Sequence, residues 1–126
     1  MELQSHSASL HTYARPGVKR LPGGSEQGHA ALLAADAARM QTMTDEAGAA
    51  LLPAFAYPYG ALDANAEKAL KAAGMQATMT SEEHSNTLTR SPECLFGLGR
   101  FERTGFMTTA QLLAKLKSKP PAKPVV

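Results

Sequence analysis

Short segments with strand-like composition alternate with longer helix-like segments along most of this chain. Apolar periodicity predicts strands and helices, in chain order strand, helix, strand, helix, strand, strand and helix, over about residues 3–5, 26–47, 54–57, 64–73, 75–79, 97–103 and 110–117. Residues suited to helix N-caps precede the three helices, namely Ser25, Asp63 and Thr108 or Thr109. Alternation of this kind is typical of a parallel α/β fold, in which functional loops follow the carboxyl ends of the strands.

The composition is that of one ordinary globular domain. The chain has 126 residues, a hydrophobic fraction of 44% and a formal charge of +2. Because no apolar run approaches ~18 residues, we expect no transmembrane segment. The nearly balanced charge argues against a nucleic-acid partner. A single cysteine, Cys94, excludes an intrachain disulfide and a cysteine-based zinc site, and residues 1–4 lack the features of a signal peptide.

Two histidines, His6 and His11, follow the first predicted strand. A spacing of five residues points their side chains apart on a helix or a strand, so they can share one ion only if a turn separates them. The small polar residues 7–9 permit such a turn. Imidazole is a common ligand of zinc, nickel, cobalt and iron, although a catalytic site usually needs three protein ligands. Two loop histidines without a ligand role remain the alternative.

The second predicted strand is expected to start after Pro53 and to end in Tyr57-Pro58-Tyr59-Gly60. Proline and glycine make a rigid turn that can present a backbone N–H to a developing oxyanion. Tyrosine rings along a groove suit the flat C–H faces of sugars. The alternative is an ordinary strand-to-helix loop whose tyrosines anchor the core.

These two motifs together resemble the polysaccharide deacetylase family, the NodB-homology carbohydrate esterases. The resemblance rests on Ser5-His6-Ser7 with a second histidine at His11, and on the stretch Phe55–Gly60. The longer histidine spacing is most similar to the poly-N-acetylglucosamine deacetylase subgroup. It implies a distorted β/α barrel, of which residues 1–117 would be a C-terminal portion lacking the first strands. Residues 118–126 are predicted to form a disordered Lys/Pro tail.

The resemblance also implies a function and a set of site residues. The expected reaction is metal-dependent hydrolysis of N-acetyl groups from an N-acetylated polysaccharide or oligosaccharide. The metal would be zinc, with nickel, cobalt or iron as alternatives, and its ligands would include His6 and His11. Tyr59 would supply a backbone oxyanion donor, and residues Tyr57, Pro58, Tyr59 and Gly60 would form a wall of the substrate groove. Family members usually act outside the cytoplasm, but the compartment of this chain stays open.

Several residues of the family pattern are missing from this chain. The family uses an Asp pair as catalytic base and third metal ligand, whereas the aspartates here are Asp36, Asp45 and Asp63, without a pair. Ala56 stands where many members carry an arginine, and the last predicted strand lacks the histidine that many members use as general acid. His84, in the polar loop 81–87, is the other candidate acid, although a plain surface loop is the alternative interpretation.

We therefore expect the chain, as a truncated or degenerate form of the domain, to have little or no hydrolytic activity by itself. Two other functional classes remain open. One is a carbohydrate-binding module without catalysis. The other is an interaction fragment that self-associates through exposed sheet edges.

Overall fold

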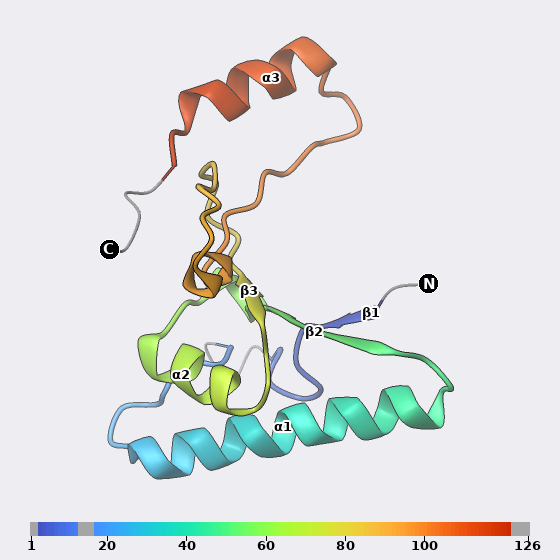
Figure 1. The fold of residues 1–126 in the computed structure, drawn as a ribbon, viewed down its shortest axis with the longest axis vertical. Helices are drawn as coiled ribbons and strands as arrows, with labels where there is room; N and C mark the ends of the chain where they lie inside the picture. Colours follow the sequence, from blue (N-terminus) through green and yellow to red (C-terminus); the bar gives the residue numbers. More distant parts are fainter. Residues whose placement is uncertain (1–2, 13–16, 122–126) are drawn as a thin grey trace.

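A computed structural model describes residues 3–12 and 17–121 of the chain. Its strands and helices, shown in Figure 1, are β1 (Leu3–Ser5), α1 (Glu26–Glu46), β2 (Leu51–Ala56), the 3₁₀ helix η1 (Pro58–Gly60), α2 (Ala64–Ala72), β3 (Ala77–Met79), the 3₁₀ helix η2 (Pro92–Leu95) and α3 (Thr109–Ser118). The alternation of strands and helices predicted from the sequence is confirmed as far as β3.

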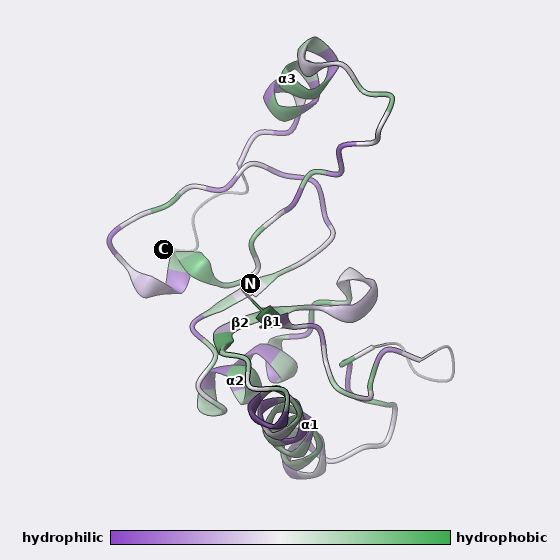
Figure 2. Cartoon of the chain, turned by 90° about the vertical axis from the view of Figure 1, so that its right-hand side faces the viewer, coloured by the Kyte–Doolittle hydropathy of each residue, from purple (hydrophilic) through white to green (hydrophobic). Residues whose placement is uncertain are grey.

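The strands form one parallel sheet in the order β1-β2-β3, which confirms the predicted parallel α/β arrangement. Helix α1 connects β1 to β2, and α2 connects β2 to β3. Both helices lie on the same side of the sheet and pack against each other (Figures 1 and 2). Since all three strands run in one direction, the loops that follow them open at one edge, which we call the carboxyl edge.

Strand β2 contains a bulge that accommodates a proline. Gln4 pairs with Leu52, but the next residue of β1, Ser5, pairs with Phe55, so that Pro53 and Ala54 are extra on the β2 side. Proline has no N–H to donate, which normally confines it to sheet edges and bulges. The bulge therefore explains how Pro53 lies inside the central strand rather than before it, as the sequence suggested.

The core lies between the sheet and the two helices. Its buried apolar side chains are Leu10, Val18, Leu33, Phe55, Tyr57, Ala66, Ala69 and Leu70. Helix α1 contributes few of them, because three of its four buried positions carry polar residues: His29, Asp36 and Thr44. Each of the three is hydrogen-bonded, and two of them, His29 and Asp36, bond to loops that pack against the helix. Burial of polar groups is tolerated when they are hydrogen-bonded in this way.

The helix caps agree with the sequence prediction. Ser25 and Asp63 accept hydrogen bonds from the first backbone N–H groups of α1 and α2, and Thr108 forms a capping box with Gln111 at the start of α3. Helix α3 extends one residue further than predicted, to Ser118. Of the disordered tail predicted over 118–126, Ser118 is the last residue of α3 and the carbonyl of Lys119 accepts a hydrogen bond from the Ser85 N–H. Residues 122–126 lie outside the described residues.

The strand predicted over 97–103 is wrong. Leu98 makes an isolated bridge to Met79, and residues 99–103 continue as coil. Leu98 and Arg100 still bond the backbone of the segment that begins in β3, through Thr78, Thr80 and Glu82. On the other side of residues 98–100, the Asn86 side chain bonds both the N–H and the carbonyl of Gly99. The Asn86 bonds therefore occupy the outer edge of this segment, where a further strand would otherwise pair.

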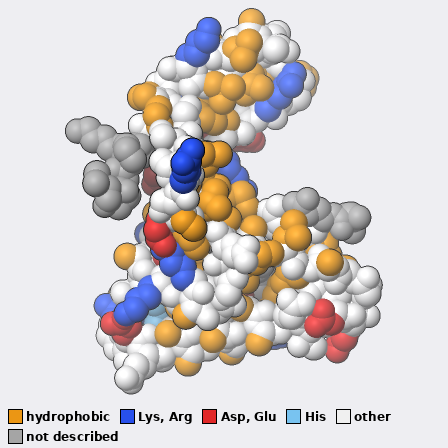
Figure 3. Space-filling model, viewed as in Figure 1, with side chains coloured by type: hydrophobic (Ala, Val, Ile, Leu, Met, Phe, Trp, Pro, Cys, Tyr) orange, Lys and Arg blue, Asp and Glu red, His pale blue; other side chains and the backbone are white. Residues whose placement is uncertain are grey.

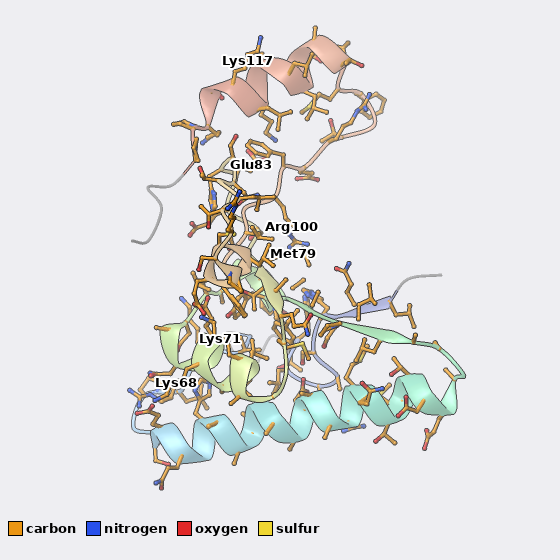
Figure 4. The ribbon with its side chains drawn as sticks, in the orientation of Figure 1. Lys68, Lys71, Met79, Glu83, Arg100 and Lys117 are labelled. Carbon is orange, nitrogen blue, oxygen red and sulfur yellow. The ribbon has the colours of Figure 1, made fainter. Side chains whose placement is uncertain are left out.

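Helix α3 lies apart from the sheet, at the end of an extended segment (Figure 1). In Figure 4, Glu83 lies below α3 and Lys117 lies on the helix. An ion pair between Glu83 and Lys115 joins the two segments. None of the residues of α3 is buried, and the side chain of Phe106, just before the helix, is 99% exposed. In the part of the chain described, no helix combines the length and apolar character needed to span a membrane.

Candidate metal and substrate site at the carboxyl edge

The fold brings the two predicted motifs together at the carboxyl edge of the sheet. The ring centroids of His6 and His11 lie 4.9 Å apart, so a turn does separate the histidines and lets their rings approach. The ring of Tyr59, from the loop after β2, lies 4.4 Å from that of His11. All three side chains are exposed. The three rings form what we call the His–Tyr cluster.

One hydrogen bond sets the orientation of the His6 ring. Nδ1 of His6 lies 2.8 Å from the carbonyl oxygen of Ala56, the last residue of β2. A carbonyl can only accept, so Nδ1 is the donor, and in the neutral ring the lone pair then belongs to Nε2. Metal-ligating histidines commonly bond a backbone carbonyl through the other ring nitrogen. The His6 ring is therefore held in a form suited to binding an ion.

The turn between the histidines is built from serine side chains. Ser7 Oγ accepts hydrogen bonds from the N–H groups of Ser9, at 3.2 Å, and Leu10, at 2.7 Å, while Ser5 Oγ accepts one from the N–H of Ser7. Ser7 has a positive φ of 75°, a conformation that costs energy for a residue with a side chain. The buried side chain of Leu10 anchors the end of the turn in the core.

Asp36, on α1, also holds this turn, a role that the sequence analysis did not predict. Its carboxylate, in the middle of α1, accepts hydrogen bonds from the N–H groups of Ala8 and Ser9 and from Ser9 Oγ. A signal was present: Asp36 follows His29 by seven residues and Leu33 by three, on the buried face of the helix. A charged residue in line with buried positions indicates a buried partner.

The residues of the loop after β2 differ in what they present to solvent. Tyr57 is 0% exposed and Pro58 is buried, whereas Tyr59 is 48% exposed and Gly60 is partly exposed. Of the four predicted substrate-binding residues, Tyr59 and Gly60 are thus the ones whose surface a substrate could contact. Tyr57 belongs to the buried core cluster.

The backbone at Tyr59 has a positive φ of 58°, like that of Ser7. Tyr59 and Ser7 are the two such non-glycine residues within the described ranges, and both belong to the carboxyl edge. None of the hydrogen bonds found among the described residues uses the Tyr59 N–H. Strained backbone is often concentrated at functional sites, and a donor left without a partner is available to a ligand.

The loop after β3 reaches the same edge but holds its histidine elsewhere. Thr80 Oγ1 donates to the Gly60 carbonyl at 3.1 Å, so the loops after β2 and β3 are in contact. His84 packs on Gly99 and lines a cavity of about 500 Å³ together with Leu62 and Glu82. Nothing in the described contacts joins His84 to the His–Tyr cluster.

The three aspartates are occupied in other parts of the fold. Asp36 bonds the turn, Asp63 caps α2 and Asp45 accepts a hydrogen bond from Gln41 at 2.7 Å. Within residues 3–12 and 17–121, no three His, Cys, Asp or Glu side chains gather as a metal site would require. His6 and His11 are the two histidines that lie close together at this edge, and an ion bound by both would need its other ligands from elsewhere.

Comparison of the chain with protein-family models, with curated proteins and with solved structures found no match. The resemblance to polysaccharide deacetylases therefore stays a prediction from the motifs.

Proposed function

We propose that this chain carries the two-histidine part of a metal-dependent deacetylase site that removes N-acetyl groups from a polysaccharide. The observation that carries the proposal is the His–Tyr cluster, in which the His6 ring is oriented by its Nδ1 hydrogen bond and lies 4.9 Å from the ring of His11. A sequential parallel sheet with its helices on one side is also the arrangement that a β/α barrel repeats. This supports, as part of the same proposal, a partial barrel of the NodB type.

The residues of the cluster would divide the work of amide hydrolysis. A divalent cation on His6 and His11, zinc or else nickel, cobalt or iron, would activate a water molecule and polarise the acetyl carbonyl. The backbone N–H of Tyr59 would donate to the carbonyl oxygen as negative charge develops on it. Addition of water and cleavage of the C–N bond then yield acetate and the free amine. The exposed Tyr59 ring would stack on a sugar face.

The first test of this proposal is titration of the chain with Co²⁺, followed by visible absorption spectroscopy. His11→Ala should weaken Co²⁺ binding at least about tenfold, since loss of a ligand costs no less than loss of an outer-sphere partner. His84→Ala is the matched control, because His84 has no described contact with the cluster, and it should leave the affinity unchanged. Equal binding by wild type and His11→Ala would refute the ion assignment.

A second candidate function is carbohydrate binding without hydrolysis. It is favoured by the 48% exposed Tyr59 ring together with three aspartates that are all engaged elsewhere. Incubation with an N-acetylglucosamine oligosaccharide, followed by NMR, separates the candidates. Acetate release supports the deacetylase, whereas binding without acetate supports the binding module. A concentration-dependent size without sugar binding would instead favour an interaction fragment that pairs through its sheet edges.

A further inference from the structure

One carboxylate connects the middle of α1 to the turn between the two histidines. Oδ2 of Asp36 accepts from the N–H of Ala8 at 3.0 Å, and Oδ1 accepts from the N–H and the Oγ of Ser9, both at 2.9 Å. The Asp36 side chain is 6% exposed. Hydrogen bonds to a charged acceptor are stronger than neutral ones, and a buried carboxylate without such donors would be costly.

We propose that Asp36 is the positioning residue of the two-histidine site and sets the approach of the His6 and His11 rings. The bonded residues, Ala8 and Ser9, lie in the centre of the turn, with one histidine on each side. Leu10, fixed in the core, and Ser7, held in a positive-φ conformation, complete the turn. A change at Asp36 would therefore act on both rings together, although Asp36 need not touch an ion or a substrate.

The carboxylate form of the side chain matters for this role. Three donors converge on two oxygens, and each oxygen accepts at least one of them. An asparagine of the same shape offers one oxygen and one NH₂ group. Whichever way the amide is turned, its NH₂ group faces a backbone N–H, so one donor loses its partner and the turn has to move.

A role confined to stability makes a different prediction. If Asp36 served only to pack α1 against the sheet, its replacement would lower the melting temperature without a separate effect on the histidines. Positioning instead predicts a change at the His6 and His11 rings in protein that is still folded. The proposal rests on the proposed function for its ion-binding readout, but the ring positions can be followed without any ion.

The experiment compares wild type, Asp36→Asn, Ser9→Ala and the control Asp45→Asn, which changes an exposed aspartate of the same helix. Three quantities are measured: the melting temperature, the imidazole NMR shifts of His6 and His11 in metal-free protein, and the Co²⁺ affinity. In folded Asp36→Asn we expect shifted imidazole resonances and a Co²⁺ affinity about 10- to 100-fold lower. Asp45→Asn should leave the imidazole shifts and the Co²⁺ affinity unchanged.

Ser9→Ala removes one of the three hydrogen bonds and leaves the carboxylate in place. It should change the imidazole shifts and the Co²⁺ affinity in the same direction but by less. If Asp36→Asn does not fold, Ser9→Ala alone tests the positioning role. Unchanged imidazole shifts in both folded variants, or in Ser9→Ala alone if it is the only folded one, would overturn the positioning role. If wild type binds no Co²⁺ but the imidazole shifts still depend on Asp36, the proposed function fails and the positioning role stands.

Discussion

The hydroxyl group of Tyr57 is buried in the core without a hydrogen-bond partner among the described residues. Burial, together with the negative charges of Glu67 and Asp63, raises the pKa of this phenol. The Thr78 side chain is near enough to oppose the shift in part, but it does not meet the geometry of a hydrogen bond to the Tyr57 hydroxyl. An unsatisfied buried polar group costs stability, so Tyr57→Phe should leave the free energy of unfolding unchanged or raise it by up to about 1 kcal/mol. Urea denaturation at neutral pH measures the change. A loss greater than about 1 kcal/mol would instead show that the hydroxyl makes a stabilising hydrogen bond.

Asp63 stabilises the start of α2 as a charged cap. Burial acts to raise the pKa of its carboxyl, but hydrogen bonds from three backbone N–H groups outweigh it and lower the pKa. The stabilisation is therefore present above the unfolded pKa of about 4 and is lost as the pH falls through the lower folded value. Asp63→Ala should cost about 1 kcal/mol at neutral pH, measured by urea denaturation.

Asp63→Asn is the control for the charge, because asparagine also caps helices well. Its stability relative to wild type should improve as the pH falls from about 4, where the carboxyl of the unfolded chain becomes neutral, through the lower pKa of the folded protein. A difference between the two proteins that does not depend on pH would contradict the charged-cap account.

At the scale of an element, the loop after β2 needs glycine at position 60. Gly60 has a φ of +63°, and an added Cβ would lie 1.9 Å from Ser81 Oγ and 2.9 Å from Ser81 N. Gly48, at the end of α1, has a similar φ of +66° but open space around it. Both changes to alanine carry the backbone cost of about 1–2 kcal/mol, and Gly60→Ala adds the contact with the next loop.

We therefore expect Gly60→Ala to destabilise the protein more than Gly48→Ala, as measured by thermal unfolding. The Gly60 change should also broaden or shift the NMR signals of Tyr59 and Ser81, since the two loops are pressed apart. Equal destabilisation by the two substitutions would mean that the loops after β2 and β3 can separate without cost.

At the scale of the whole molecule, stability should be unevenly distributed. Helices α1 and α2 cover the core, whereas α3 buries no residue and is joined to the rest by surface contacts such as the Lys115–Glu83 pair. The side chains of this pair are 26% and 27% exposed, so water still screens it, and ion pairs at the surface contribute only about 0–1 kcal/mol. Amide hydrogen exchange in α3 should thus be at least about tenfold faster than in the buried turns of α1. Comparable protection in both helices would show that α3 is held by more than these contacts.

Apolar side chains also remain exposed on α3 and on the segments near it, as expected for a helix that packs little against the rest of the protein. Figure 3 shows hydrophobic side chains exposed on α3 and on the segment below it. Exposed large apolar residues of this region include Leu88, Phe106 and Leu113.

How much of this molecule the sequence predicts depends on how local the cause of each feature is. Helices and caps follow from nearby residues, as Ser25 and Asp63 illustrate, and their positions were predicted closely. The strand predicted over 97–103 is reduced to one bridge, because its pairing depends on residues 78–82, which lie far from it in the sequence. Similarly, Pro53 is typical of a strand start, and only the pairing with β1 shows that it lies in a bulge inside the strand.

In the candidate site, too, the residues in local motifs were predicted and the residue with distant partners was not. The histidines and Tyr59 were predicted because their motifs are local, and the chain does bring these side chains together. Asp36 was missed, because its partners lie 27 and 28 residues away in the chain. The burial of Tyr57 was left open, since a tyrosine beside a turn can face either the core or a groove.

The bulge in β2 has a consequence for how this segment can vary in length. Side chains alternate along a strand, so Phe55 and Tyr57 reach the core only with the present number of residues after Leu52. Deletion or insertion of one residue there would turn both rings to the opposite face and would move the Ala56 carbonyl away from His6. Residues 53 and 54 should accordingly tolerate many exchanges of side chain but no gain or loss of a residue.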